Sequence, residues 1–139
     1  MHVQRDIEIR LREKNLRVTD QRVAVLEFLA SATHHPTAED VGAAVNKLVP
    51  RASRASVYNV LHSLKEAGLI DELVFDDAVA RYDANLDRHH HFVCRACNAV
   101  EDVMWDAFPS GPRRRLPDGR TVESYSVTLR GLCPSCLRA

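Results

Sequence analysis

The stretch HHHFVCRAC, residues 89–97, places three imidazoles and two thiols within nine positions. Imidazole nitrogens and thiolate sulfurs are ligands that transition metals prefer in proteins. The stretch therefore predicts metal chemistry. It leaves open whether the metal only holds the fold together or reports on something outside the protein.

All four cysteines fall into two C-x-x-C pairs, Cys94 with Cys97 and Cys133 with Cys136. Two such pairs offer the tetrahedral set of thiolates that holds Zn²⁺ at about 2.3 Å and leaves no position for a substrate. We therefore expect a structural zinc site that fastens the C-terminal strand to the start of its domain. The alternative is a pair of thiol switches, because a C-x-x-C thiol can have a lowered pKa.

The histidines need a second explanation, because the cysteines already complete one metal site. On a strand, His89 and His91 project to one face and His90 to the other. Carboxylates stand near them in the sequence, at Asp83, Glu101 and Asp102. Imidazoles with carboxylates and without thiolate favour Fe²⁺, Mn²⁺ or Zn²⁺ over Cu⁺. The alternative is a polar strand face whose histidines are only solvated.

The composition is that of a globular protein and not of a disordered or membrane-spanning one. Hydrophobic residues make up 45% and charged residues 27% of the 139 positions. No apolar run approaches the roughly 18 residues that span a bilayer, and the N-terminus lacks the apolar region of a signal peptide, so we expect a cytoplasmic protein. The 19 basic side chains equal the 19 acidic ones, so any nucleic-acid binding must come from local placement of charge.

The first half of the chain predicts four helices followed by a hairpin. The helices are expected within residues 6–32 (two helices), 35–48 and 53–70, and the hairpin from β-prone runs at 69–75 and 78–84 joined by Asp76 and Asp77. Expected start and stop residues are Thr19 or Asp20, Thr37 with Asp40, Ser53 and Gly68. The buried stripes are expected to contain Ile7, Leu11, Val23, Leu26, Phe28 or Leu29, Val41, Val45, Leu48, Val57, Val60 or Leu61, and Leu64. This pattern favours a winged helix-turn-helix, whose last helix enters the DNA major groove; the alternative is a helical core with an incidental hairpin.

The second half predicts a small sheet. HHFVCRAC and VEDVMW are compatible with adjacent strands, and ESYSVTLRGLC alternates Tyr125, Val127 and Leu129 against small polar residues, as in a strand with one buried face. Residues 109–120 contain three prolines and two glycines and are expected to form a loop. Within it, the run Arg113–Arg115 is interpreted as a solvated surface.

Several motifs together resemble the ferric uptake regulator (Fur) superfamily. NLRVTDQRVAVLEFL, HPTAEDV, SRASVYNVLHSLKEAGLI, ARYDAN, HHHFVCRAC and GLCPSC follow one another in the order seen in that superfamily, over nearly the whole chain. The chain is most similar to the peroxide-sensing, PerR-like branch, and within it to actinobacterial repressors of catalase genes. The resemblance implies an α+β protein with a winged helix-turn-helix DNA-binding domain over 1–83, a hinge over 84–88, and a small α/β dimerisation and metal-binding domain with the four-cysteine zinc site over 89–139. It implies a homodimeric transcriptional repressor that binds double-stranded operator DNA and is not an enzyme.

The resemblance also implies a regulatory site for Fe²⁺ or Mn²⁺ and a response to H₂O₂. The positions that match the family's ligands are His35, Asp83, His89, His91 and Asp102. In peroxide sensors of this type, H₂O₂ reacts at the iron and a ligating histidine is oxidised, by analogy His35 or His89. Iron sensors of the family tend to have Glu where Asp102 stands. An iron- or zinc-uptake repressor remains the alternative.

The remaining expectations concern DNA and the other histidines. The DNA-contacting residues are expected to be Arg17 and Arg22 at phosphates and Arg54, Ser56 and Tyr58 in the groove. His34 and His90 are expected to face solvent. A metalloenzyme is a further alternative, since three histidines with carboxylates can form an open catalytic centre, but no nucleophile–base pair or glycine-rich phosphate loop accompanies them.

Overall fold

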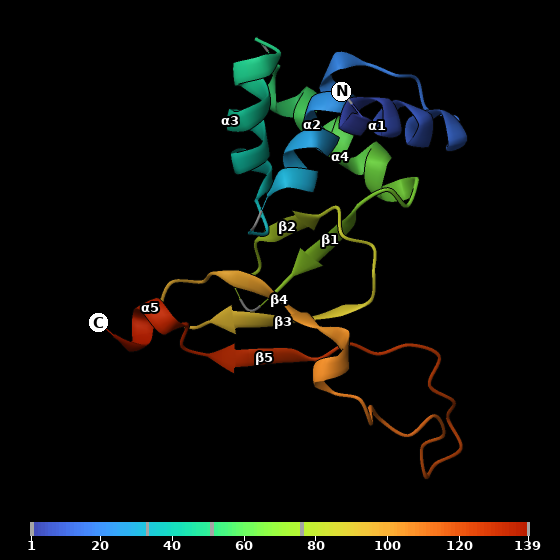
Figure 1. Ribbon diagram of the computed structural model, residues 1–139, viewed down its shortest axis with the longest axis vertical. Coiled ribbons are helices and arrows are strands. Elements are labelled where there is room, and N and C mark those ends of the chain that lie inside the picture. The colour runs from blue at the N-terminus through green and yellow to red at the C-terminus, as the bar shows by residue number, and fades with distance from the viewer. Residues whose placement is uncertain (1, 33, 51, 76, 139) are drawn as a thin grey trace. The chain divides into compact units, whose positions relative to one another are not determined.

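The computed structural model describes residues 2–32, 34–50, 52–75 and 77–138, and it divides into two compact units, Met1–Leu86 and Asp87–Ala139 (Figure 1). The first unit is mainly helical and the second contains a three-stranded sheet, which confirms the predicted α+β class. Among the described residues, no helix has the length and apolar character needed to span a bilayer.

The N-terminal unit contains the four predicted helices and the predicted hairpin. In chain order they are α1 (His2–Glu13), α2 (Asp20–Ser31), α3 (Ala38–Leu48), α4 (Arg54–Glu66), β1 (Asp71–Val74) and β2 (Ala80–Asp83). The two strands pair antiparallel, with Val74 opposite Ala80. Of the two residues predicted to join them, Asp77 is described and Asp76 lies outside the described residues. Helices followed by a two-stranded wing make this unit a winged helix.

The helix ends follow the chemistry of their terminal residues. Three helices begin after a residue whose side-chain oxygen accepts a backbone N–H, namely Thr19, Thr37 and Ser53. Asp40 also accepts the backbone N–H of Thr37, which completes the predicted capping box. Helix α4 closes at Gly68, whose φ of +76° is left-handed, while the N–H groups of Gly68 and Leu69 donate to the carbonyls of Lys65 and Leu64.

The core of the N-terminal unit contains the predicted stripes, with one correction, and also includes Val25, Leu69, Ile70 and Tyr82. Leu29 rather than Phe28, and Leu61 rather than Val60, is the buried member of each predicted pair. Leu48 was expected to point inward, but it is 65% exposed. The stripe of α3 continues from Val45 to Val49 instead, because Val49 packs on the core while its N–H donates to the carbonyl of Val45.

The C-terminal unit is a sheet in the order β4-β3-β5. Its elements are β3 (His89–Cys94), β4 (Val100–Met104), a 3-10 turn η1 (Trp105–Ala107), β5 (Thr128–Gly131) and α5 (Pro134–Leu137). Strands β3 and β4 are neighbours, as predicted, and they pair antiparallel, whereas β5 runs parallel to β3. The predicted last strand is shorter than its alternating pattern, because Tyr125 and Val127 precede β5 and surround His90. Residues 109–120 form a loop, as expected.

The expectation that His90 faces solvent is wrong. His90 is fully buried, its ring is stacked on Trp105 with centroids 4.5 Å apart, and its Nδ1 accepts the N–H of Val127 at 2.9 Å. The N–H of Val127 satisfies Nδ1 and the aromatic rings pack on the imidazole, while the buried Nε2 has no hydrogen-bond partner among the described residues. His34, by contrast, is exposed as expected.

Truncation of the helical core should be costly only where the side chain is buried. Leu64 is fully buried and Leu48 is 65% exposed. We expect Leu64→Ala to lower the free energy of unfolding of the N-terminal unit by about 2–5 kcal/mol, because it leaves a cavity. Leu48→Ala should change it by less than about 0.5 kcal/mol. Urea unfolding followed by the helical circular dichroism signal measures both, and equal losses would contradict this assignment of the core.

Candidate metal centres

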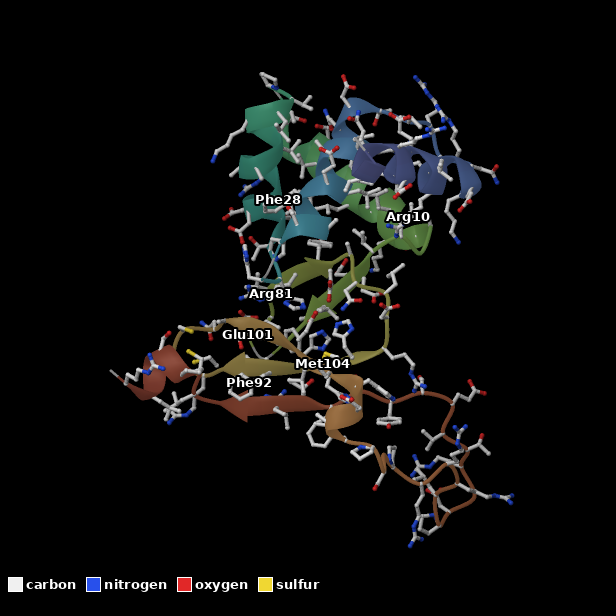
Figure 2. All side chains as sticks on the ribbon, viewed as in Figure 1. Arg10, Phe28, Arg81, Phe92, Glu101 and Met104 are labelled. Atoms are coloured by element: carbon white, nitrogen blue, oxygen red, sulfur yellow. The ribbon has the colours of Figure 1, made fainter. Side chains whose placement is uncertain are left out.

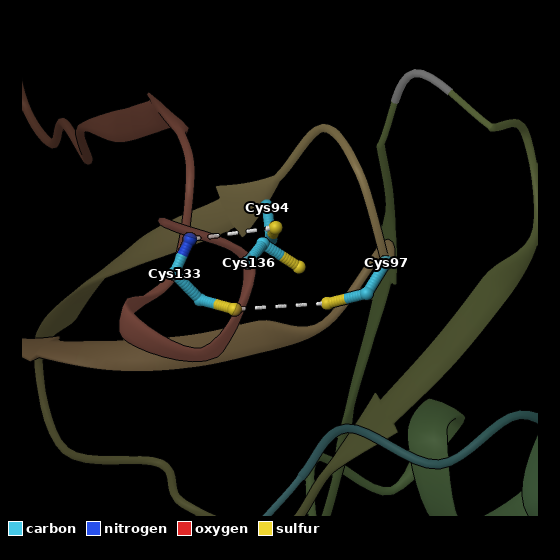
Figure 3. A group of neighbouring side chains, drawn as sticks. All are labelled: Cys94, Cys97, Cys133 and Cys136. Atoms are coloured by element: carbon cyan, nitrogen blue, oxygen red, sulfur yellow. Dashed lines mark hydrogen bonds between the residues drawn. The ribbon is translucent and has the colours of Figure 1, made fainter. Parts of the chain in front are cut away.

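The four cysteines gather at one end of the C-terminal sheet. Cys94 ends β3, Cys97 lies in the turn that leads to β4, Cys133 follows β5, and Cys136 lies in α5. Strands β3 and β5 are parallel, with Cys94 opposite Gly131. The two C-x-x-C pairs therefore follow the strands at the same end of the sheet. Figure 3 shows the resulting cluster, in which the sulfurs of Cys97 and Cys133 are 3.9 Å apart.

The cluster fits a tetrahedral zinc ion. The four sulfurs lie within 4.8 Å of one another. A tetrahedron with metal–sulfur bonds of about 2.3 Å has sulfur–sulfur edges of about 3.8 Å, close to the 3.9 Å between Cys97 and Cys133. Four sulfurs leave no open position on such an ion, so the arrangement suits a structural role rather than a catalytic one.

The thiols of the cluster differ in acidity. The backbone N–H of Cys133, which donates to the Cys94 sulfur at 3.4 Å, and the N–H of Cys97 lower the pKa of Cys94 to about 6. Hydrogen bonding with the sulfurs of Cys133 and Cys94 raises the pKa of Cys136 to about 12. The N–H of Ala99 lowers the pKa of Cys97, but hydrogen bonding with Cys94 and burial outweigh it, and the net pKa is raised. Without a cation, the cluster therefore resists full ionisation.

The predicted nitrogen and oxygen donors of the N-terminal unit form a pair. His35 Nε2 lies 3.0 Å from Asp83 Oδ2, and only 5% of the His35 side chain and 12% of the Asp83 side chain are exposed. Asp83 is the last residue of β2, and His35 precedes α3. An imidazole and a carboxylate so close together and so far from water can bind a divalent cation.

Backbone and side-chain contacts fix the loop that carries His35. The N–H of Tyr82 donates to the carbonyl of Pro36, and Arg81 donates to the carbonyl of His35 at 3.3 Å. Arg81, labelled on β2 in Figure 2, is itself held by an ion pair with Asp77 at 3.0 Å. Reasoning from sequence missed this role of Arg81, although its place two residues before Asp83 in an alternating strand was a usable signal.

The predicted donors of the C-terminal unit lie together on one face of its sheet. Asp102 is directly opposite His91 in the register of β3 and β4. Its Oδ1 lies 3.3 Å from His89 Nε2 and 3.8 Å from His91 Nε2. Glu101 is opposite Phe92 in the register and so belongs to the other face. The structure therefore separates the two adjacent carboxylates that the sequence had left together.

A backbone contact orients the imidazole of His89. Its Nδ1 lies 2.5 Å from the carbonyl oxygen of Asp87. Because a carbonyl can only accept, Nδ1 carries the proton in this contact, and the neutral ring presents Nε2 as its lone-pair donor. A second hydrogen bond of this kind is how proteins commonly fix a metal-binding histidine. The His91 ring lies edge-on to His89, with centroids 4.7 Å apart.

The predicted DNA-contacting residues all lie in the N-terminal unit. Arg54, Ser56 and Tyr58 occupy the first turns of α4. Tyr58 is 47% exposed, whereas Arg54 is paired with Glu39 and the Ser56 hydroxyl donates to the carbonyl of Ser53. Near the start of α2, Arg17 is exposed, and its carbonyl accepts a hydrogen bond from the Arg22 guanidinium at 2.7 Å.

Comparisons with known proteins agree with this fold. The family model described as the ferric uptake regulator family matches residues 13–129. The chain is similar to the transcriptional regulator FurA of Mycobacterium tuberculosis, with 40% identity covering 94% of this chain and 90% of that protein. It is also similar to the peroxide operon regulator of Bacillus subtilis, with 33% identity covering 91% and 88% of the two chains. The manganese-containing structure of the ferric uptake regulator from Pseudomonas aeruginosa matches with a TM-score of 0.72 and 30% identity, covering 92% of this chain and 98% of that one.

A winged helix joined to a sheet with clustered metal donors is the architecture of a metal-dependent transcriptional regulator. The extent of the family match shows that this chain belongs to the ferric uptake regulator family. Members of this family are DNA-binding regulators and not enzymes. They act as dimers on operator DNA and bind structural zinc together with regulatory iron or manganese.

Zinc binding to the cysteine cluster should release protons. Cys97 and Cys136, whose pKa values are raised, enter the reaction protonated at pH 8, while Cys94, with a pKa of about 6, enters as a thiolate. We expect release of about two or more protons per zinc, and an affinity for zinc that falls as the pH falls, because protons compete with the metal. Indicator titration of zinc-free protein in weak buffer measures the release.

Two variants test the origin of these protons. Cys136→Ser should lower the proton release at pH 8 by about one, because it removes a thiol that must ionise. Cys94→Ser should leave the release nearly unchanged, because that sulfur is already ionised at this pH. The same loss in both variants would contradict the division of acidity within the cluster.

Proposed function

We propose that this chain is a peroxide-responsive repressor whose DNA binding depends on Fe²⁺ or Mn²⁺ held by His35, Asp83, His89, His91 and Asp102, with Zn²⁺ in the cysteine cluster. The observation that carries the proposal is the gathering of imidazoles with carboxylates and without sulfur within each unit: His35 with Asp83 in one, and His89 and His91 with Asp102 in the other. Such donors suit Fe²⁺ and Mn²⁺.

Asp102 supports a peroxide response over metal uptake. Family iron sensors tend to have Glu at this position, and the shorter carboxylate lies on the histidine face while Glu101 does not. Relatives support the same reading, since the protein from Bacillus subtilis is a peroxide operon regulator. An iron- or zinc-uptake repressor is the second candidate, favoured by the likeness to the ferric uptake regulator of Pseudomonas aeruginosa.

The proposed ligands would link metal binding to DNA binding. Because they come from both units, a metal held by all of them restricts the units to one mutual orientation, and binding energy then selects that orientation. Two copies in a fixed orientation can place their α4 helices in successive major grooves. Loss of one ligand removes part of the binding energy that favours the DNA-binding state.

The proposed ligands include the imidazole that H₂O₂ would oxidise. A bound Fe²⁺ would supply catalysis for the reaction of H₂O₂ with a ligating imidazole: the ring gives up two electrons, one peroxide oxygen is inserted into a ring C–H bond, and the other leaves as water. Asp83 and Asp102 would hold His35 and His89 in place beside the metal. Oxidation would fall on an imidazole ring and not on either carboxylate. An oxidised imidazole is a poorer ligand, so the metal would be released.

Peroxide should abolish operator binding only in the iron form. We expect brief H₂O₂ treatment of the Fe²⁺-loaded protein to reduce operator affinity by at least about 10-fold and to add one oxygen atom to the peptide that contains His35 or His89. The Mn²⁺-loaded protein should keep its affinity. Electrophoretic mobility shift and peptide mass spectrometry measure the two outcomes. Iron-loaded protein that keeps its affinity under peroxide would point to metal uptake instead.

Adjacent histidines provide a matched control. His35→Ala should weaken the metal-dependent operator affinity, because it removes a buried donor paired with Asp83. His34→Ala, which changes an exposed neighbour of the same type, should leave that affinity unchanged. If both variants behave like the wild type, His35 is not a ligand of the regulatory metal.

Contacts between arginine side chains and DNA phosphates should make the operator affinity depend on salt concentration. Arg17→Ala should weaken binding to operator and to unrelated duplex alike and should reduce the slope of log affinity against log salt by about 1, because one phosphate contact is lost. Arg95→Ala, an equal change of charge at an exposed site of the C-terminal unit, is the control and should leave the slope unchanged. Equal slopes in the two variants would remove Arg17 from the interface.

A further inference from the structure

The C-terminal unit contains a polar cavity that the metal donors do not use. It has a volume of about 260 Å³ and lies between Arg88, which precedes β3, Trp105 of η1 and the loop after η1. Two arginines from distant parts of the sequence, Arg88 and Arg114, line it together with Ser110, Ser124 and Tyr125. The sequence had suggested only a solvated surface for the run that includes Arg114.

Aromatic rings hold the first arginine in place. The guanidinium carbon of Arg88 lies 4.0 Å from the ring centroid of Trp105 and 5.9 Å from that of Tyr125. These contacts orient a charged group without neutralising it, because the attraction is to the ring quadrupole and not to an anion. Within the part of the chain that the structure describes, Arg88 has no carboxylate partner.

Backbone contacts position the second arginine and shape the cavity wall. The N–H of Val122 donates to the carbonyl of Arg114 at 2.7 Å, which fixes this part of the loop. Gly111 has a φ of +54°, and a Cβ added there would overlap the hydroxyl group of Tyr125. The wall therefore requires glycine at this position. Arg114, like Arg88, forms no ion pair with any described residue.

We propose that the cavity is a binding site for a small oxyanion, a phosphate or carboxylate group, held by the guanidinium groups of Arg88 and Arg114. Arginine is suited to such groups because its planar donors bind two oxygens at once. Serine hydroxyls in the lining can donate further hydrogen bonds. Two positive charges in one cavity repel each other, and an anion would relieve that repulsion. A metal cation is disfavoured there for the same reason.

Glu123 is the one acidic side chain in the lining, and it sharpens the test. No described arginine forms an ion pair with it. Its negative charge opposes an anionic ligand, so its removal should tighten binding. If Glu123 were instead the resident partner of the two arginines, the wild-type protein would bind no small anion, and only the Glu123→Gln variant would bind one.

Trp105 is the only tryptophan of the chain and lies in the lining, so its fluorescence reports on this cavity. We would titrate the full-length, zinc-loaded protein with inorganic phosphate and, in a second arm, with citrate, at constant ionic strength set by sodium chloride. A saturable change in emission with either anion is the expected result, and the tighter of the two identifies the ligand class. A change that grows linearly, or none with either anion, would overturn the proposal.

Variants of two neighbouring arginines distinguish a specific binding site from nonspecific electrostatic attraction. Arg114→Ala should weaken binding by about 10-fold, because it removes a charged donor. Arg113→Ala makes the same change of charge one residue away and outside the lining, and it should leave the affinity within about 2-fold. Glu123→Gln should tighten binding. Equal weakening in the two arginine variants would show nonspecific attraction, and isothermal titration calorimetry on all variants provides a readout independent of fluorescence.

Discussion

The four sulfurs at the end of the β3–β5 pair are the constraint on which the C-terminal unit depends. Its described apolar side chains supply little core. Among the described residues of this unit, the buried hydrophobic ones are Val100 and two of the cysteines, Cys94 and Cys133. A unit this small gains little free energy from apolar burial. A metal ion bound by four thiolates can replace such a core, because its binding energy is folding energy. Strand β3, which carries His89 and His91, is therefore positioned by the same cluster.

The chain separates its two kinds of metal chemistry by ligand type. Sulfur donors occupy one edge of the sheet, and their spacing closes a tetrahedron. Nitrogen and oxygen donors occupy a face of the same sheet and, in the helical unit, the loop before α3 and the end of β2. A soft and complete set of thiolates holds its ion without room for reaction, whereas imidazole with carboxylate binds iron or manganese and leaves the coordination incomplete. Ligand chemistry thus suits the sulfur cluster to a structural ion and the nitrogen and oxygen donors to the proposed regulatory ion.

Three consecutive histidines show how a strand gives one residue type different roles. His89 and His91 lie beside Asp102 on one face, while His90 is buried on the other against Trp105. The alternation follows from the pleat of the strand alone. On the His90 side, the aromatic rings also hold Arg88, so the same cluster that buries an imidazole orients a guanidinium toward the polar cavity.

The local features of this protein could be predicted from short stretches of its sequence. Capping residues set the starts of three helices, Gly68 set the end of α4, and the two C-x-x-C pairs specified a four-sulfur site, because each signal acts within a few residues of its own position. The motifs of the family indicated which histidines and carboxylates to examine, and their assignment as regulatory ligands stays a prediction.

Other features depended on tertiary packing. These are the exposure of Leu48, the burial of His90 and the departure of Tyr125 from the strand pattern. Tertiary packing also brought Arg88 and Arg114 to one cavity. Periodicity reports which face of an element is apolar, but contacts between segments far apart in the chain depend on packing, and packing is not encoded in any single stretch.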